Sequence, residues 1–272
     1  MRSYKVQTKD QISLHVQEWN DNKKPKGTIC IIHGLGEHQN RYTHVAEFYI
    51  LNGFQVYSYD QRGHGKSEGK RGHSPGLGYS IDDLERVLKT ISHQHLFLYG
   101  HSFGGNVLAN FLLRKQPKYL RGAILSAAWL QLAKEPYVIE LAMAKLMNKL
   151  IPSFTQNNKL DSADLSNDKL VCTIYDEDIL NHNQISVRLF SEFYPAGKWA
   201  IKNAEKLPIK TLMIHGEDDK IISKSGTKKF AKNSNGKAEY KIFKNTKHEP
   251  HNDNTKEDVF AYTLNWLNKM LS

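Results

Sequence analysis

A serine between two glycines is the feature of this 272-residue chain with the clearest chemistry. Ser102 lies in the Gly-His-Ser-Phe-Gly-Gly run at residues 100–105, directly after a short apolar run and directly before the helical pattern 107–113. A sharp turn between a buried strand and a helix presents a serine hydroxyl above the sheet edge as a nucleophile. Gly100 and Gly104 remove side chains that would clash where the chain doubles back. The pattern predicts that Ser102, with a strained backbone, attacks a carbonyl group.

A nucleophilic serine needs a base, and the base needs a carboxylate that orients it. On a scaffold of this kind the partners follow in the order serine, acid, histidine, each on a loop after a strand. The histidines beyond the Gly-Glu-Asp-Asp turn are His248 and His251, and we prefer His248 because it is nearer the end of the preceding strand. In that turn Asp218 and Asp219 are both possible as the acid, and Glu217 is a weaker third.

Two backbone amides could stabilise the oxyanion that forms when the serine attacks. Leu35 lies in the His-Gly-Leu-Gly-Glu-His run at residues 33–38, which follows an apolar run, and Phe103 directly follows the nucleophile. Each such donor is typically worth roughly 10²–10³ in rate. His33 and His38 are assigned to shaping the loop, because the chain order places the base after the serine.

The elements that must position these residues alternate between strands and helices. Short apolar runs predict strands at 28–32, 54–59, 96–99, 122–126, 209–215 and 240–243. Helical patterns follow at 41–51, from Ser80, at 107–113, at 223–233 and from Asn254. Residues 4–19 alternate as in a hairpin. The glycine-rich stretch 60–67 is interpreted as architecture, with Asp60 and Arg62 paired to fix the loop. The predicted fold class is α/β, with a mostly parallel central sheet flanked by helices.

The strand and helix alternation breaks between residues 128 and 200. Residues 136–150 form a helical pattern that is apolar over most of its circumference, so this helix is either deeply buried or turned toward lipid. A second helix is expected at 184–193. We interpret 128–200 as a helical cap inserted between the core segments 1–127 and 201–272. Methionine-rich apolar surface adapts to varied apolar ligands. The cap residues expected at the substrate are Val138, Ile139, Met143 and Met147.

Composition and charge exclude several classes of protein. The two cysteines, Cys30 and Cys172, are too few for a disulfide framework, and no Cys/His spacing suggests a metal, so no cofactor is expected. The net charge of +10 comes from scattered lysines without a nucleic-acid motif, which predicts no nucleic-acid partner and leaves weak contact with anionic lipid open. Neither a signal peptide nor a transmembrane run is seen, so the expected location is the cytoplasm. The sequence does not indicate an oligomeric state.

The chain resembles the monoacylglycerol lipase and lysophospholipase branch of the α/β-hydrolases over nearly its whole length. The residues that carry the resemblance are the runs 33–38 and 60–67, Arg41 and Tyr42, the run 100–105, the turn 216–219 and the His-Glu pair 248–249. The resemblance implies Asp219 rather than Asp218 as the acid, supports His248, and implies a lipid-facing cap. The stretch 178–182 resembles the cap pattern of that family but lacks the proline that usually follows its aspartate.

The reaction implied is hydrolysis of a lipid ester, of monoacylglycerol or lysophospholipid type, through an acyl-enzyme. A short-chain carboxylesterase or an aminopeptidase with the same three residues is one alternative. An aminopeptidase needs carboxylates in the cap to hold an amino group, and the cap offers Glu140, Asp176, Glu177 and Asp178. A non-catalytic ligand-binding protein on the same fold is the alternative of another class, and the intact Ser102 and His248 argue against it.

Overall fold

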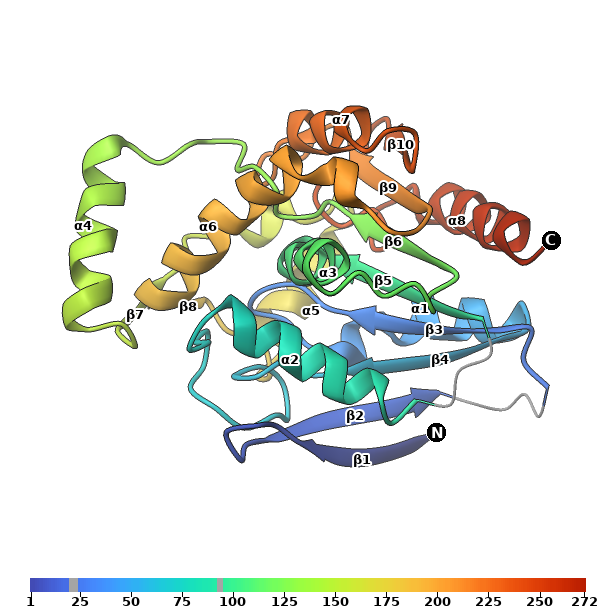
Figure 1. The fold of residues 1–272 in the computed structure, drawn as a ribbon, viewed down its shortest axis with the longest axis horizontal. Helices are drawn as coiled ribbons and strands as arrows, with labels where there is room; N and C mark the ends of the chain where they lie inside the picture. The colour runs from blue at the N-terminus through green and yellow to red at the C-terminus, as the bar shows by residue number, and fades with distance from the viewer. Residues whose placement is uncertain (20–23, 92–94) are drawn as a thin grey trace.

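The computed structural model describes residues 1–19, 24–91 and 95–272. Within these residues, eight strands form one sheet in the order β1-β2-β4-β3-β5-β6-β9-β10 (Figure 1). The strands are β1 (Arg2–Gln7), β2 (Ser13–Trp19), β3 (Gly27–Ile32), β4 (Phe54–Tyr59), β5 (Leu96–His101), β6 (Gly122–Ser126), β9 (Thr211–Gly216) and β10 (Ala238–Phe243). β2 pairs antiparallel with β1 and β4, and every pairing from β4 to β10 is parallel. The predicted hairpin and mostly parallel sheet are confirmed.

Helices cover both faces of the sheet, because the buried strands carry apolar side chains on both sides. In β3, Cys30 and Ile32 belong to one apolar core, whereas Ile29 and Ile31 belong to the other. The helices packed on the main sheet are α1 (Thr43–Leu51), α2 (Leu77–Leu88), α3 (Ser102–Lys115), α6 (Val187–Lys202), α7 (Lys224–Asn233) and α8 (Lys256–Leu271). The core with Cys30 receives α2, α3, α6 and α7, and the core with Ile29 receives α1 and α8.

Between β6 and β9 the chain leaves the sheet, where the sequence predicts a cap. This stretch holds α4 (Val138–Leu150), β7 (Thr155–Asn157), the short 3₁₀ turn η2 (Ser162–Asp164), α5 (Lys169–Glu177) and β8 (Gln184–Ser186) before α6. The helix expected at 184–193 is instead the short strand β8 followed by α6, and α5 is a helix that the sequence pattern did not predict. Asn106 on α3 donates to the Phe193 carbonyl at 2.9 Å, so α6 is packed on α3. The division into core and cap stays a prediction.

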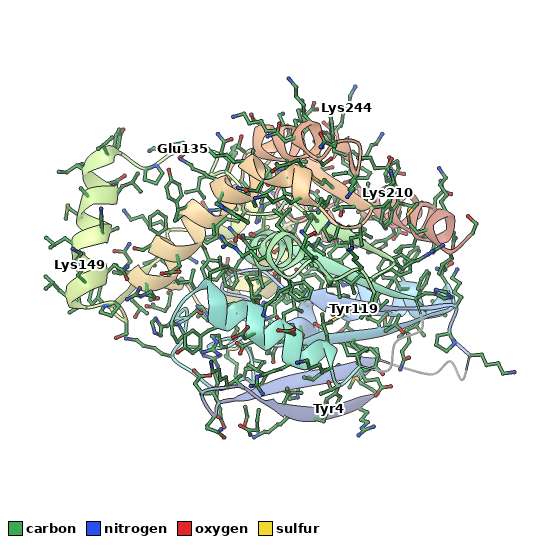
Figure 2. The ribbon with its side chains drawn as sticks, in the orientation of Figure 1. Tyr4, Tyr119, Glu135, Lys149, Lys210 and Lys244 are labelled. Carbon is green, nitrogen blue, oxygen red and sulfur yellow. The ribbon has the colours of Figure 1, made fainter. Side chains whose placement is uncertain are left out.

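Helix α4 stands apart from the sheet at the outer edge of the molecule (Figure 1). None of its residues is buried, so of the two alternatives for this helix the deeply buried one is excluded. An apolar stripe at helical spacing is exposed to solvent: Ile139 is 67%, Met143 57%, Leu146 59% and Leu150 71% exposed. Figure 2 places Lys149 on the outer side of the same helix. In the described residues, no helix is both long enough and apolar enough to cross a bilayer.

The loop after β4 is fixed differently from the prediction. Arg62 does not pair with Asp60, because its Nε donates to Asp83 at 2.6 Å and its Nη1 to Asp10 at 3.0 Å. Asp60 instead accepts a hydrogen bond from the Gln39 amide at 2.9 Å. The predicted Asp60–Arg62 pair is therefore wrong, and each residue ties this loop to a more distant segment.

Candidate active site

Ser102 lies at the junction of β5 and α3, the strand-turn-helix context that the sequence predicts. Its backbone φ is +50°, a left-handed conformation that non-glycine residues rarely adopt. A Cβ at Gly104 would lie 2.3 Å from the Ile32 carbonyl oxygen, and a Cβ at Gly105 would lie 2.7 Å from the Ala128 Cβ. The two glycines therefore allow α3 to begin directly against β3 and the β6 loop, which holds the serine at the carboxyl end of the sheet.

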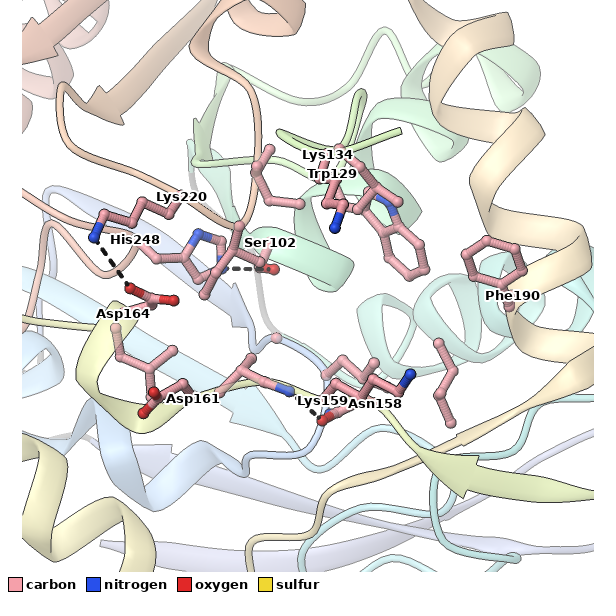
Figure 3. Close-up of a pocket in the computed structure, with 18 of the residues that line it drawn as sticks. Ser102, Trp129, Lys134, Asn158, Lys159, Asp161, Asp164, Phe190, Lys220 and His248 are labelled. Carbon is pink, nitrogen blue, oxygen red and sulfur yellow. Dashed lines mark hydrogen bonds and ion pairs between the residues drawn. The ribbon is translucent and has the colours of Figure 1, made fainter. Parts of the chain in front are cut away.

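Three side chains from distant parts of the chain meet at this point. His248 Nε2 lies 3.0 Å from Ser102 Oγ (Figure 3). On the other side of the ring, His248 Nδ1 lies 2.8 Å from Asp219 Oδ2. Ser102 follows β5, Asp219 follows β9 and His248 follows β10, so each belongs to a loop after a parallel strand. Distances of this size allow a proton to pass from the hydroxyl to the imidazole while the carboxylate orients the ring.

The other candidates from the sequence lie elsewhere. The His251 ring stacks on Tyr42 with centroids 4.7 Å apart, and burial lowers the pKa of His251 to about 3. Asp218 is exposed, and its amide donates to the Thr246 carbonyl at 2.9 Å. The neighbouring Glu217 is exposed as well. The geometry therefore brings His248 and Asp219 together with the serine, and not these three residues.

Asp219 and His248 each stabilise the charged form of the other. Burial opposes ionisation of Asp219, but the His248 charge and hydrogen bonds from His215 and His248 hold the pKa of Asp219 well below its usual range. The same carboxylate accepts backbone hydrogen bonds from Ile221 at 2.8 Å and Ile222 at 2.9 Å. Burial disfavours the imidazolium form of His248, but Asp219 overcomes this and raises the pKa of His248 above its ordinary value. The arrangement suits a histidine that must carry a proton briefly.

The loop at 33–38 lies against Ser102. A Cβ at Gly34 would lie 3.3 Å from Ser102 Cβ, and Leu35 lines the cavity that contains Ser102. Phe103 is the second residue of α3, so its amide has no partner within the helix. Within the described chain, neither the Leu35 amide nor the Phe103 amide donates to a protein acceptor. Both amides are therefore free to bind a substrate oxygen, and their role as an oxyanion hole stays a prediction.

A buried ionic cluster holds this loop from behind, and the sequence pattern alone assigns it no role. Glu37 accepts hydrogen bonds from the Gly34 amide at 2.5 Å and from Tyr42 at 2.8 Å. Arg41 donates to Glu37 at 2.5 Å and makes two bonds to Glu249, at 2.6 and 2.7 Å. The Glu249 backbone follows His248 directly, so Arg41 connects the loop at 33–38 with the loop that carries His248. Arg41, Tyr42 and Glu249 carry the family resemblance, which was the signal available in the sequence.

His33 and His38, which the sequence assigns to shaping the loop, both make hydrogen bonds that hold it. His33 Nε2 accepts the Gln61 amide at 2.9 Å, and the His33 carbonyl accepts the Gln61 side chain at 2.6 Å. His38 Nε2 lies 2.7 Å from Asp178 Oδ2, on the cap side of the loop. Neither ring is placed to take a proton from Ser102.

A cavity of about 510 Å³ contains Ser102 and His248 in its wall (Figure 3). Its apolar lining comes from Leu35, Trp129, Leu132, Leu160, Leu165, Ile185, Phe190, Ile221 and Ile222. Its polar lining includes Tyr137, Gln156, Asn157, Asn158 and Tyr175, and the charged residues Lys134, Glu135, Glu140, Lys159, Asp161, Asp164 and Lys220. Among the residues described, no cluster of three or more His, Cys, Asp or Glu could hold a metal ion.

The four cap residues expected at the substrate do not line this cavity. Val138, Ile139 and Met143 are exposed to solvent, and Met147 is half-buried. From the start of the same helix, Tyr137 and Glu140 reach the cavity instead. An apolar helical pattern identifies exposed apolar surface, but it does not say which side of the helix the substrate occupies.

Comparisons with known proteins agree with this architecture. A curated monoacylglycerol lipase of Mycolicibacterium smegmatis is 27% identical over 255 residues, which are 92% of this chain and 90% of that protein. An uncharacterized abhydrolase domain-containing protein of Dictyostelium discoideum is 34% identical over 270 residues. The match covers 97% of this chain but only 28% of that longer protein. The solved monoacylglycerol lipase of Paleococcus ferrophilus superposes with a TM-score of 0.87 at 26% identity, covering 99% of this chain and 100% of that one.

A monoglyceride lipase of Saccharomyces cerevisiae, solved with a substrate analog, has the same fold, with a TM-score of 0.87 at 22% identity over 100% of this chain and 96% of that one. The α/β-hydrolase fold expected from the sequence is confirmed, as is the expected similarity to monoacylglycerol lipases. A family model described as serine aminopeptidase, S33, matches residues 23–255. The chain therefore belongs to this family of α/β-hydrolases.

Proposed function

We propose that the chain is a carboxylic ester hydrolase that cleaves lipid esters of the monoacylglycerol type through a Ser102 acyl-enzyme. The observation that carries the proposal is the chain of contacts from Ser102 Oγ through His248 to Asp219, with spacings of 3.0 and 2.8 Å, at the wall of a large cavity. The names of the Mycolicibacterium and Paleococcus relatives support the same substrate class.

In the proposed mechanism His248 takes the Ser102 proton as the hydroxyl attacks the ester carbonyl. Asp219 holds the Nδ1–H tautomer of the ring and stabilises the imidazolium that forms. The Leu35 and Phe103 amides donate to the oxyanion. His248 then protonates the departing alcohol, and a water molecule attacks the acyl-enzyme by the same sequence of proton transfers.

The cavity suits an ester with one apolar and one polar part. Trp129, Ile185 and Phe190 offer apolar wall for an acyl chain. Asn157 and Asn158 offer amide groups that can hydrogen-bond hydroxyls of an alcohol such as glycerol. A lysophospholipid is the second candidate, because the polar part of the cavity also holds lysines, including Lys134.

An aminopeptidase is less well supported, because the carboxylates of Glu135, Glu140 and Asp178 already have partners. Glu140 accepts the Tyr137 amide at 2.8 Å and so caps the start of α4. Glu135 lies 2.9 Å from Lys198, and Asp178 is bound to His38. A substrate ammonium at Glu135, Glu140 or Asp178 would compete with these contacts. A non-catalytic binding protein would have no need of a serine hydroxyl bonded to a buried imidazole.

Contact with a lipid surface is part of the proposal. The apolar stripe of α4 is exposed, and Lys145 and Lys149 lie on the same helix. Apolar side chains beside cations favour reversible adsorption to membranes that contain anionic lipid. Such adsorption would bring a water-insoluble ester to the cavity.

The test is a substrate panel with an active-serine probe. Wild type is expected to react with a fluorophosphonate and to hydrolyse a monoacylglycerol faster than lysophosphatidylcholine, p-nitrophenyl esters or aminoacyl p-nitroanilides. Ser102→Ala should abolish labelling and reduce turnover by roughly 10⁶. Asp218→Asn is the matched control, because this exposed acid next to Asp219 makes no contact with His248. Preference for the anilides would identify an aminopeptidase, and undiminished turnover by Ser102→Ala would refute the mechanism.

A further inference from the structure

The end of α5 and the segment after it reach across to the oxyanion loop at residues 33–38. His38 belongs to that loop, and its Nε2 lies 2.7 Å from Asp178 Oδ2. The His38 side chain is 4% exposed and that of Asp178 is 25% exposed, so the contact is largely screened from water. Charge-assisted hydrogen bonds in such surroundings are short and directional. Asp178 thus holds the loop from the cap side.

A second contact lies beside the amide of Leu35. The His182 amide donates to the Gly36 carbonyl at 2.8 Å. Gly36 has a φ of +78°, and a Cβ there would lie 2.3 Å from the His182 carbonyl oxygen. The two backbones therefore approach as closely as a glycine allows. This contact restrains the residue that directly follows Leu35, and with it the direction of the Leu35 N–H.

The same segment also reaches the other proposed oxyanion donor. The rings of His182 and His64 have centroids 4.6 Å apart, and the His64 ring stacks on Phe103 at 6.1 Å. Burial lowers the pKa of His182 to about 4 and holds that of His64 well below its usual range, so these contacts join neutral rings. One stretch of cap thus supports both sides of the site where the substrate oxygen would lie.

We propose that Asp178 is a positioning residue for the oxyanion hole: its bond to His38 keeps the loop at 33–38 in the conformation that aims the Leu35 amide at the substrate oxygen. The cap segment 178–182 is then a part of the catalytic machinery as well as a cover for the cavity. This inference rests on the proposed function, because it takes Leu35 and Phe103 as the oxyanion donors. Asp178 itself does not line the cavity, so it acts through the loop.

The test separates transition-state binding from substrate binding in Asp178→Ala. A misdirected donor weakens interactions with the tetrahedral oxyanion and leaves the ground state nearly unchanged. We expect kcat on a monoacylglycerol to fall roughly 10–100-fold, with KM nearly unchanged. A boronic acid that forms a tetrahedral adduct with Ser102 should lose affinity by the same factor, whereas a non-hydrolysable ether analogue should keep its affinity.

Matched variants distinguish positioning from loss of folding. Asp178→Asn keeps one oxygen, which can still accept from the Leu180 amide that lies 2.9 Å from Oδ1, and its NH2 group can donate to Nε2 of the other His38 tautomer, so it should recover part of the lost kcat. His38→Ala combined with Asp178→Ala should be no worse than one change alone, because both remove one contact. Asp176→Ala is the control, since Asp176 accepts from Ser162 within the cap, and it should retain wild-type kcat.

Two results would overturn the proposal: wild-type kcat in Asp178→Ala, or a loss of ether-analogue affinity as large as the loss of boronic-acid affinity. The second result would make the segment a wall of the substrate site and nothing more. Failure of the proposed function gives a different pattern. In that case Ser102→Ala keeps its turnover, whereas failure of the positioning role leaves Ser102→Ala inactive and Asp178→Ala fully active.

Discussion

His215 Nε2 lies 3.0 Å from Oδ2 of Asp219, the oxygen that His248 Nδ1 approaches at 2.8 Å. The same His215 nitrogen is 3.1 Å from the Ile222 carbonyl, so two acceptors face it and it must carry a hydrogen. His215 Nδ1 lies 2.8 Å from the Thr227 hydroxyl, which fixes the other side of the ring. One oxygen of Asp219 therefore contacts two imidazole rings. His215 is a second hydrogen-bond donor to the proposed catalytic acid.

Removing that donor should change both stability and the pH profile. In His215→Leu the buried Asp219 and Thr227 lose a partner, which we expect to cost about 1–3 kcal/mol of unfolding free energy. An Asp219 oxygen that is no longer shared interacts more strongly with the His248 imidazolium, so the acidic limb of kcat/KM should move to higher pH. Urea unfolding and pH–rate profiles measure the two effects. His215→Gln can donate to Asp219, so it should restore part of the lost unfolding free energy and part of the shift in the acidic limb. An unchanged pH profile in His215→Leu would contradict the role of His215 as a donor to Asp219.

Activity should depend on pH through His248. The ring must be neutral to accept the serine proton, and Asp219 raises the pKa of His248 above its ordinary value despite burial. We therefore expect kcat/KM to rise with pH and to reach half its maximum above pH ~6.5, the unperturbed value for histidine. Asp219→Asn should reduce kcat by roughly 10⁴ and should move the midpoint of the residual activity to lower pH. A midpoint that stays in place would show that Asp219 does not set the pKa of the base.

The pKa shifts of His248 and Asp219 also predict how the unfolding free energy depends on pH. Ser102→Ala, expected to be inactive, is the variant in which to measure it. Because the pKa of His248 is raised on folding, its stabilisation is complete below pH ~6.5 and is lost as pH rises through the folded value. Because the pKa of Asp219 is lowered, its stabilisation is present above pH ~4 and is lost as pH falls through the folded value. Adding Asp219→Asn should flatten both limbs of a plot of unfolding free energy against pH.

The nucleophile turn predicts a sharp contrast between two glycines. A Cβ at Gly104 would meet the Ile32 oxygen at 2.3 Å and the His33 oxygen at 2.4 Å, and backbone atoms cannot rotate away. We expect Gly104→Ala to lower the unfolding free energy by about 1–3 kcal/mol and to reduce labelling of Ser102 by a fluorophosphonate. A Cβ at Gly78 on α2 would have no other atom within 4 Å, so Gly78→Ala should raise stability by about 0.5–1 kcal/mol. Equal effects at the two sites would refute the steric argument.

The sequence predicts best what depends on neighbouring residues. The strands are apparent because fully buried strands need continuous apolar runs, and Ser102 is apparent because its turn is built from adjacent glycines. The choice between Asp218 and Asp219, by contrast, does not depend on neighbouring residues. Both follow the same strand, and only the contact with His248 from a loop 29 positions later separates them in space. Local pattern leaves that choice open, and the family resemblance supplied it.

Long-range pairing explains the differences between prediction and structure. Arg62 was expected to pair with Asp60, two residues away, but it reaches Asp83 in α2. The helix expected from Ser80 begins at Leu77. The apolar pattern of α4 was correctly identified, but a pattern cannot say whether protein, substrate or solvent lies against it. These facts depend on partners that the chain brings together only when it folds.

The apolar stripe of α4 leads to the last prediction. Leu146 and Leu150 are 59% and 71% exposed, do not line the cavity, and lie beside Lys145 and Lys149. Transferring such side chains into lipid is favourable by about 1.5–3 kcal/mol each. Leu146→Ser with Leu150→Ser should therefore weaken co-sedimentation with phosphatidylglycerol-containing vesicles and slow hydrolysis of a monoacylglycerol embedded in them. Hydrolysis of a water-soluble p-nitrophenyl ester should remain at the wild-type rate, because the catalytic groups are untouched.

A matched change on a different helix tests whether the stripe acts as a surface. Leu170 and Ile174 on α5 are 65% and 54% exposed, so Leu170→Ser with Ile174→Ser removes similar apolar area away from α4. Vesicle binding should be affected less by this change than by the α4 pair. If both variants lose binding to the same degree, adsorption depends on total exposed apolar area, and α4 is not the contact. If the soluble ester is hydrolysed as slowly as the embedded one, the α4 side chains support the catalytic site instead of meeting lipid.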